Sequence, residues 1–382
     1  MKKHFLLFIA ACFMLGCPPG ASHKPMPPLF GVAKVLDTGA EPSFLITEDF
    51  NGDGNLDLVV TNSGDNTFSL YKGKGDGTFR EQIIFRTGDQ PICIVTGDFN
   101  GDGLPDLAEL NYRDQNIQVF RNTGLGSFRN TGVLLKPGKI PLNLAAGDLN
   151  KDGFTDLAVT LRYHKVVVFW GKRRGKFSQP VSIPVRGQPT SLVLGDYNGD
   201  NRPDIAVALA GSGNVGAQII WGAGGNAFKT SRVFRGGGQP LSIANIDANG
   251  DGRTDLVTSS NSTHIMALFL NKGGGVFESL RDFASGDFPK FVAVADFTGD
   301  GKPDLAVSNA TNDTISVVLG KGNGTFTYPP IYHAVDEYPQ GIAAGDFNHD
   351  GLTDLAIACR DKNLLDILLK RKPPASATPP GA

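Results

Sequence analysis

A ten-residue acidic pattern that recurs seven times constrains the fold of this chain more than any other sequence feature. The pattern has Asp at positions 1, 5 and 9, and an oxygen-bearing side chain at position 3. Successive copies are 48 to 51 residues apart. The copies begin at Asp49, Asp98, Asp148, Asp196, Asp247, Asp296 and Asp346. A fixed period of this length is typical of propellers, solenoids and other repeat architectures.

Each repeat contains further landmarks around its acidic loop. A proline stands seven residues before the first Asp, and a glycine-rich turn ending in Phe follows later in the repeat. The prolines are Pro42, Pro91, Pro141, Pro189, Pro240, Pro289 and Pro339. The apolar runs between these landmarks are four to six residues long, which indicates strands rather than helices. Seven units of four short antiparallel strands predict an all-β, seven-bladed β-propeller.

The repeat spacing also predicts how the ring closes. The turn Phe stands 12 or 13 residues before the next proline in six repeats, but no seventh copy follows the last acidic loop. Counting 12 residues back from Pro42 reaches Phe30. We therefore expect residues 30–37 to complete the last blade, so that the ring has no open edge.

The chain ends suggest export. Residues 1–16 have the basic start and apolar core of a signal peptide. Cys17 follows Leu-Gly as in a bacterial lipoprotein box, and we expect it to carry the lipid; Cys12 and an ordinary cleaved signal are the alternatives. Residues 17–28 form a Pro-rich tether, 29–371 the propeller and 372–382 a disordered tail. The expected location is the outer membrane or cell surface, or the periplasm or medium if no lipid is attached.

The propeller body holds two cysteines, Cys93 and Cys359, both in apolar runs. The repeat places them in blades that are not neighbours. We expect buried free thiols rather than a disulfide.

The acidic loops have the oxygen-rich spacing that Ca²⁺ requires. Side chains at positions 1, 3, 5 and 9 and the backbone carbonyl at position 7 would be the ligands. The predicted ligands are Asp49, Asn51, Asp53, Asn55 and Asp57; Asp98, Asn100, Asp102, Leu104 and Asp106; Asp148, Asn150, Asp152, Phe154 and Asp156; Asp196, Asn198, Asp200, Arg202 and Asp204; Asp247, Asn249, Asp251, Arg253 and Asp255; Asp296, Thr298, Asp300, Lys302 and Asp304; and Asp346, Asn348, Asp350, Leu352 and Asp354.

Turns stabilised by Asp and Asn without any metal are the alternative for a single loop. Seven copies of three mutually repelling carboxylates favour up to seven structural calcium ions. Asn201 replaces the turn glycine of the fourth loop, and we expect that site to survive because Asn tolerates positive φ. Thr298 is a shorter, poorer ligand than Asn, so the sixth site is expected to be among the weakest.

The acidic loops and the Gly-x-Gly-x-Phe turns resemble the FG-GAP and VCBS-type repeats of the integrin α-subunit propeller and of many bacterial secreted proteins. The resemblance covers residues 29–371 and implies the fold. It does not imply one function, because similar proteins include adhesion receptors, seven-bladed lectins and some polysaccharide lyases.

Loops on the face opposite the acidic loops vary between repeats and combine aromatic with basic side chains. Such side chains suit a sugar or an acidic ligand, although a solvated loop surface is the alternative for any one of them. The candidates are Tyr112, Arg113, Arg162, Tyr163, His164, His264, Phe288, Tyr338 and Arg360.

The best functional interpretation is a binding or adhesion module, expected to be monomeric, for a glycan or a protein. The formal net charge is −2, and seven bound Ca²⁺ would make the protein strongly positive, which favours an anionic partner. A polysaccharide lyase on the same fold, with Tyr163 and His164 as catalytic candidates, and a scaffold subunit of an envelope complex are the alternatives. No basic stripe indicates nucleic-acid binding.

Overall fold

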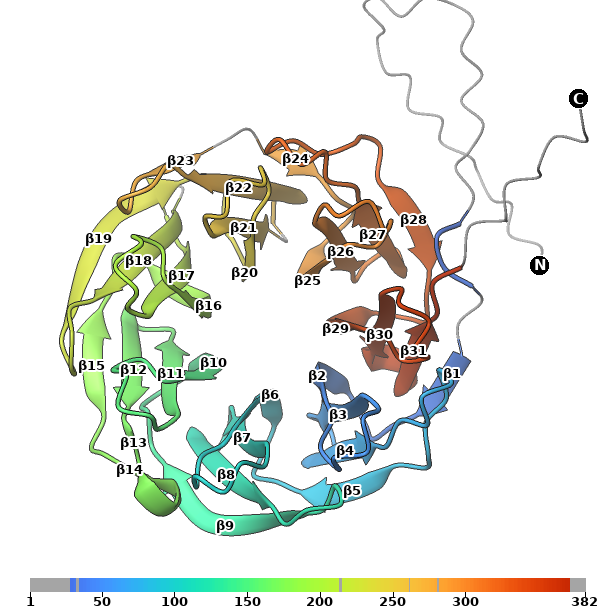
Figure 1. Ribbon diagram of the computed structural model, residues 1–382, viewed down its shortest axis with the longest axis horizontal. Coiled ribbons are helices and arrows are strands. Elements are labelled where there is room, and N and C mark those ends of the chain that lie inside the picture. The colour runs from blue at the N-terminus through green and yellow to red at the C-terminus, as the bar shows by residue number, and fades with distance from the viewer. Residues whose placement is uncertain (1–27, 32–33, 213–214, 261, 280–281, 372–382) are drawn as a thin grey trace, which may run out of the picture.

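The computed structural model describes residues 28–31, 34–212, 215–260, 262–279 and 282–371, and these form a closed ring of seven blades (Figure 1). The predicted seven-bladed all-β propeller is therefore confirmed. The signal peptide, most of the tether, Cys17 and the tail 372–382 lie outside the described residues. Among the described residues, no helix is long and apolar enough to cross a membrane.

Each blade is an antiparallel sheet whose strands run in order from the channel to the rim. The strands are β2 (Pro42–Glu48), β3 (Asp57–Asn62), β4 (Thr67–Tyr71) and β5 (Ile83–Arg86) in blade 1; β6 (Pro91–Gly97), β7 (Asp106–Asn111), β8 (Asn116–Asn122) and β9 (Phe128–Leu135) in blade 2; β10 (Pro141–Gly147), β11 (Asp156–Leu161), β12 (Lys165–Phe169) and β15 (Val181–Pro184) in blade 3; and β16 (Gln188–Gly195), β17 (Asp204–Ala210), β18 (Gly216–Gly222) and β19 (Phe228–Arg235) in blade 4.

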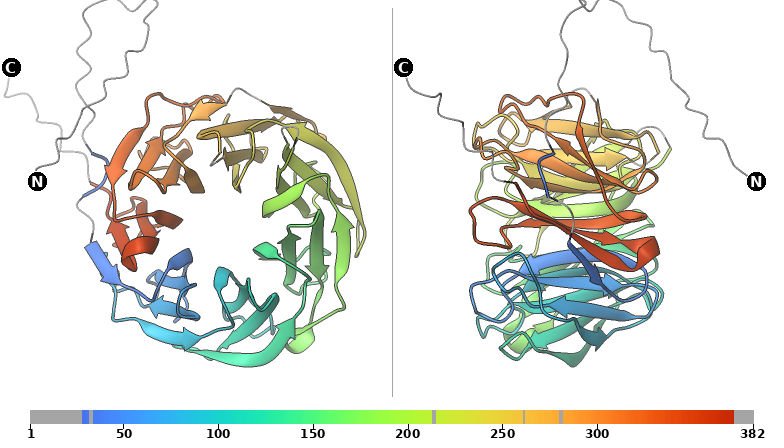
Figure 2. Two further views of the ribbon diagram at one scale, coloured as in Figure 1. Left: turned by 180° about the vertical axis from the view of Figure 1, so that it is seen from behind. Right: turned by 90° about the vertical axis from the view of Figure 1, so that its right-hand side faces the viewer.

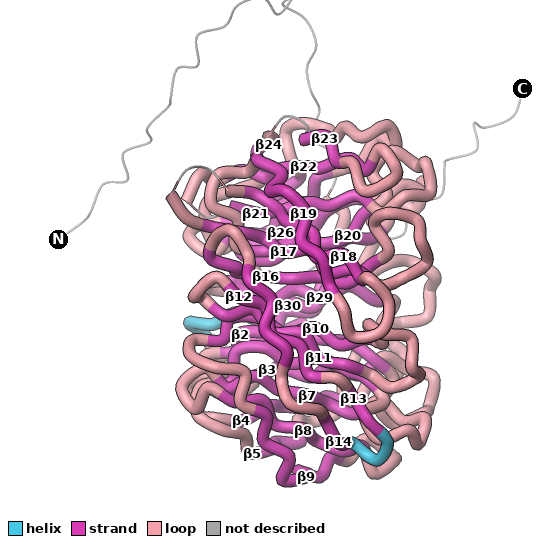
Figure 3. Tube along the Cα trace, turned by 90° about the vertical axis from the view of Figure 1, so that its left-hand side faces the viewer, coloured by secondary structure: helices cyan, strands magenta, loops and turns pink. Residues whose placement is uncertain are grey.

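The remaining three blades follow the same order. Their strands are β20 (Ser242–Ile246), β21 (Asp255–Ser260), β22 (Ile265–Asn271), β23 (Phe277–Ser279) and β24 (Phe283–Ala284) in blade 5; β25 (Pro289–Ala295), β26 (Asp304–Asn309), β27 (Thr314–Val318) and β28 (Ile331–Ala334) in blade 6; and β29 (Pro339–Gly345), β30 (Asp354–Cys359), β31 (Leu364–Leu368) and β1 (Lys34–Asp37) in blade 7. Blade 3 adds the small hairpin β13 (Gly171–Lys172) and β14 (Lys176–Phe177). Two short 3₁₀ helices, η1 (Arg173–Gly175) and η2 (Arg360–Lys362), lie on opposite sides of the ring (Figure 3).

The N-terminal strand closes the ring as the repeat spacing predicted. Strand β1 pairs antiparallel with β31, with Lys34 opposite Ile367, and Phe30 forms a bridge to Lys370. Phe30 is 1% exposed and meets Phe297 of blade 6 edge to face. The first strand of the chain therefore sits on the outside of the last blade (Figures 1 and 2).

The core lies between the blades because each second strand is buried on both faces. In blade 1, Leu58 and Val60 pack toward blade 7, whereas Val59 packs toward blade 2. Alternate side chains along one strand therefore serve two neighbouring interfaces. Cys93 and Cys359 are buried and free, as predicted, and burial raises the pKa of the Cys93 thiol to about 12.

Candidate functional sites on the two faces of the ring

The two faces of the ring carry different loops. The acidic loops, between the first and second strands, share one face with the glycine-rich hairpins that follow the third strands. The turns between second and third strands lie on the other face, which we call the opposite face. Figure 3 shows the strands crossing the thickness of the ring, with loops gathered at both sides.

The Asp at position 9 of each acidic loop is buried at the start of a second strand. These residues are Asp57, Asp106, Asp156, Asp204, Asp255, Asp304 and Asp354, each at most 1% exposed. In blade 1, Asp57 Oδ2 accepts a hydrogen bond from the Phe50 N–H (3.1 Å), and Oδ1 accepts one from the Gly73 N–H (2.9 Å). The same two bonds recur in the other six blades. This carboxylate ties the loop to the end of the third strand, a role that the sequence pattern did not reveal.

The Asp at position 1 organises its own loop. Asp49 Oδ1 accepts hydrogen bonds from the N–H groups of Gly52 (2.8 Å) and Asp53 (3.2 Å), and Oδ2 accepts one from Gly54 (2.8 Å). Asp53 Oδ1 in turn accepts a bond from the Asn55 N–H (2.9 Å). Gly54 has a φ of 84°, which glycine adopts without a steric penalty. The loop is thus wound tightly around its first carboxylate.

The three carboxylates of one loop interact, but they are not gathered as metal ligands. Burial raises the pKa of Asp57 to about 6 against its two backbone hydrogen bonds, and the charges of Asp53 and Asp49 raise it further. The same balance acts on the position-9 Asp of the third to seventh loops. Within the described residues, no three acidic, His or Cys side chains converge closely enough to hold a metal ion. The oxygen donor set suits Ca²⁺, and the side chains would have to draw together around it.

In three of the loops, a basic side chain forms a salt bridge with the position-5 Asp. Arg121 pairs with Asp102 (2.8 Å), Arg253 with Asp251 (2.7 Å) and Lys302 with Asp300 (2.8 Å). In the other four loops, no described basic side chain forms a salt bridge with this carboxylate. The seven loops therefore share the two backbone hydrogen bonds of the position-9 Asp and differ in the charge beside the position-5 Asp.

The two loops that depart from the pattern keep the same winding. Asn201 has a φ of 62° and donates its N–H to Asp196 Oδ2 (2.7 Å), so it takes the conformation of the glycine it replaces. The Thr298 hydroxyl donates to Asp296 Oδ1 (3.2 Å) in its own loop.

On the opposite face, four of the predicted residues come together around a lysine. Lys290 Nζ lies 5.0 Å from the ring centroid of Phe288 and 5.4 Å from that of Tyr338. Arg360 Cζ lies 5.6 Å from the Tyr338 centroid, and His264 Nδ1 accepts a hydrogen bond from the Phe288 N–H (2.9 Å). We call Lys290, Phe288, Tyr338 and Arg360 the aromatic–cation cluster.

Charge in the aromatic–cation cluster is distributed unevenly. Arg360 forms a salt bridge with Glu41 of blade 1 (3.1 Å), whereas no described carboxylate forms one with Lys290. Burial and the Arg360 charge lower the pKa of Lys290. A cation beside aromatic rings gains about 0.5–2 kcal/mol from them.

The cluster lies where the central channel meets the opposite face. Phe288 and Tyr338 directly precede the first strands of blades 6 and 7, and both have positive φ (57° and 58°). Nearby, Phe44 of blade 1 and Phe291 of blade 6 meet edge to face at 5.5 Å. Blade 7 lies between these two blades, and its Gly341 packs directly against Phe44.

Lys290 was missed by the sequence reasoning. The corresponding residues after the repeat prolines are Ser43, Ile92, Leu142, Thr190, Leu241 and Gln340. The available signal was a lone basic residue in this series, two positions after the aromatic Phe288.

The other predicted residues of the opposite face stay apart from this cluster. Arg113 approaches Asp89 at 4.0 Å, and Arg162 and Tyr163 are exposed in the β11–β12 turn. His164 Nδ1 lies 2.7 Å from the Gly187 carbonyl oxygen. Tyr163 is 59% exposed.

Similar folds occur among solved structures at low sequence identity. BBS1N, solved in complex with ARL6DN, has a TM-score of 0.65 at 14% identity, over 91% of this chain and 98% of that chain. Virginiamycin B lyase from Staphylococcus aureus has a TM-score of 0.62 at 12% identity, over 90% and 100% of the two chains. Raptor from Chaetomium thermophilum has a TM-score of 0.61 at 14% identity, and the match covers 91% of this chain and 29% of that one. These likenesses show the fold alone.

No curated protein matches the sequence. The family model described as "FG-GAP-like repeat" matches six overlapping segments, which are residues 49–109, 110–159, 148–207, 196–258, 247–307 and 296–357. These segments begin at or just after acidic loops and extend over most of the ring. The resemblance inferred from the loops and turns is confirmed, and the chain belongs to the FG-GAP-like repeat family.

Proposed function

We propose that the protein is an exported binding module, stabilised by calcium, that holds a carboxylate-bearing partner at the aromatic–cation cluster. The observation that carries this proposal is Lys290, a cation between two rings at the channel mouth with no described acidic partner. A carboxylate could pair with its ammonium while an apolar edge or sugar ring packs on Phe288 or Tyr338.

An acidic glycan and an acidic protein segment both present carboxylates. BBS1N, which shares the fold, was solved in complex with a protein partner, so a protein segment is a reasonable occupant. The glycan alternative rests on the pairing of aromatic and basic side chains alone.

The test is binding of two probes, an oligogalacturonate and a hexaglutamate peptide, to the whole protein in millimolar calcium. We expect one probe to bind in a salt-sensitive manner, and Lys290→Met to weaken it roughly tenfold or more. Lys165→Met changes an exposed lysine at the start of β12 on the same face, so it is the matched control and should leave binding unchanged. Equal loss in both variants, or binding insensitive to salt, would contradict the assignment.

We propose separately that the acidic loops bind Ca²⁺ as structural ions. The residues that would hold the ion in the first loop are Asp49, Asn51, Asp53 and Asp57, with the Asn55 carbonyl. Bound calcium would neutralise carboxylates that otherwise repel each other, one of them buried. Calorimetric titration of the whole protein should give several sites and no more than seven; absence of any calcium heat at millimolar concentration would refute this.

A further inference from the structure

Five of the seven seams between blades contain the same kind of aromatic contact, and two do not. The Phe of a glycine-rich turn packs on the position-2 residue of the preceding blade's acidic loop. The paired residues are Phe79 with Phe347, Phe128 with Phe50, Phe177 with Phe99, Phe277 with Tyr197 and Phe30 with Phe297, with ring centroids 5.5 to 6.2 Å apart. Five of the seven seams are therefore filled by two rings.

The other two seams have a smaller residue at position 2. Between blades 3 and 4 this residue is Leu149, and Trp170 stacks on Phe228 at 5.5 Å. Between blades 5 and 6 it is Ala248, and Phe326 stacks instead on Phe283 of the outer strand β24 at 4.7 Å.

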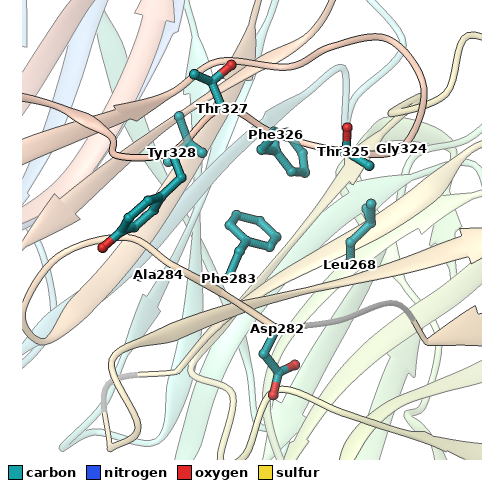
Figure 4. Close-up of a pocket in the computed structure, with 10 residues that line it drawn as sticks. Leu268, Asp282, Phe283, Ala284, Gly324, Thr325, Phe326, Thr327 and Tyr328 are labelled. Atoms are coloured by element: carbon teal, nitrogen blue, oxygen red, sulfur yellow. The ribbon is translucent and has the colours of Figure 1, made fainter. Parts of the chain in front are cut away.

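A cavity of about 340 Å³ lies at this last seam, beside the Phe283–Phe326 pair. Leu268, Val318 and Ala284 add further carbon surface to its wall. Figure 4 shows the Phe283 and Phe326 rings facing each other, with Tyr328 to one side and Asp282 beyond Phe283. The volume falls within the range of small-molecule sites, which are about 300–1,000 Å³ and mostly apolar.

Few polar groups line the cavity, and the one charged group among the described lining residues is negative. Asp282 is the single carboxylate among the described lining residues, and none of those residues is basic. Asp282 Oδ1 accepts a hydrogen bond from the Gly237 N–H (3.2 Å), and no described donor is bonded to Oδ2. The Thr325 hydroxyl is engaged with Asn323 Oδ1 (2.6 Å). Tyr328 is 76% exposed at the rim.

We propose that this cavity is a binding site for a small planar aromatic amine. The ring would pack against Phe283, Phe326 and Leu268, and the ammonium would pair with Asp282. A neutral ring would gain only the apolar contacts, and an anionic one would be repelled by the Asp282 carboxylate. This site is on the rim, separate from the aromatic–cation cluster, and does not depend on the proposed function.

The test uses three probes with the same ring and different charge, namely tryptamine, indole and indole-3-acetate. Binding to the whole protein in millimolar calcium is measured by calorimetry. We expect affinity to fall in that order. Asp282→Asn should weaken tryptamine up to about fivefold, as for a partly exposed ion pair, and leave indole unchanged. Asp76→Asn, on the blade 1 hairpin, is the charge control and should have no effect.

A second pair of variants tests the apolar wall. Ala284→Leu adds bulk inside the cavity and should reduce the affinity of both tryptamine and indole by more than tenfold. Ala334→Leu is the matched control, since Ala284 and Ala334 stand opposite Ile265 and Thr314, the first residues of their third strands. Circular dichroism confirms that each variant is folded. Absence of tryptamine binding, equal affinity for all three probes, or unchanged affinity in Ala284→Leu would overturn the proposal.

Discussion

The two faces of the ring differ in how much the blades vary. On the acidic-loop face, the buried position-9 Asp makes the same two backbone hydrogen bonds in every blade. On the opposite face, the residues preceding the repeat prolines are Glu41, Gln90, Ile140, Gln188, Gln239, Phe288 and Tyr338. The two hydrogen bonds repeated in seven places hold the blades together, whereas the feature present once is where we propose that a partner is recognised.

Calcium removal should have the largest effect and should act on the repeated face. Ligands that bind only the folded state stabilise it by about 2.7 kcal/mol per site at 100 times the dissociation constant. With several loops occupied, excess EDTA should lower the melting temperature by roughly 10 °C or more. EDTA saturated beforehand with calcium is the control. A fall in melting temperature of less than about 2 °C would contradict the claim that calcium in these loops stabilises the protein.

Within one loop, the buried and the exposed Asp should contribute differently to the free energy of unfolding, even without calcium. Asp57→Asn replaces an oxygen that accepts a backbone N–H with an amide that donates, which should cost about 1–3 kcal/mol of unfolding free energy. Asp53→Asn keeps an acceptor for the Asn55 N–H and should cost less. Denaturant unfolding in EDTA compares them, and equal costs would remove the distinction between positions 5 and 9.

Substitutions on the opposite face should change the affinity for the probe and leave the stability of the blades unchanged. Tyr338→Ala removes a ring from Lys290 and Arg360, and should weaken the carboxylate probe severalfold. Tyr112→Ala, an aromatic deletion on the same face in blade 2, should leave probe affinity unchanged. Melting temperatures of both variants are measured alongside. If both lose affinity equally, the cluster is not the site.

The smallest expected effect is a difference in calcium affinity between individual acidic loops. Arg253→Ala removes the cation paired with Asp251 and should strengthen calcium binding at the fifth loop by about two- to fivefold. Arg202→Ala, at the same position of the fourth loop, removes no salt bridge to Asp200 and should change little. Hydrogen exchange of each loop across a calcium titration gives the separate midpoints. A stronger response in Arg202→Ala would run against the role given to the salt bridges.

The sequence predicted the fold well because its information is periodic. The spacing of the prolines, acidic loops and turn Phe residues identified seven blades and the closing role of Phe30. Side-chain roles that depend on contacts between blades were less visible. Lys290 lies beside aromatic residues of blades 6 and 7, and the cavity beside Phe326 is lined by residues of blades 5 and 6.

The position-9 Asp shows a second limit of prediction from the sequence. Its type and spacing indicated a metal ligand, and the same type and spacing also suit an acceptor for two backbone N–H groups. A short oxygen-rich pattern does not separate these roles, because backbone donors leave no trace in the sequence.

Hydrogen exchange of the whole protein, followed by mass spectrometry with calcium and with EDTA, tests the division between the faces most directly. The account predicts that calcium slows exchange in the acidic loops, above all at the amides that bond to the position-1 Asp, such as Gly52 and Gly54. Exchange in the turns between second and third strands should change little. Equal protection on both faces, or none in the acidic loops, would contradict the account.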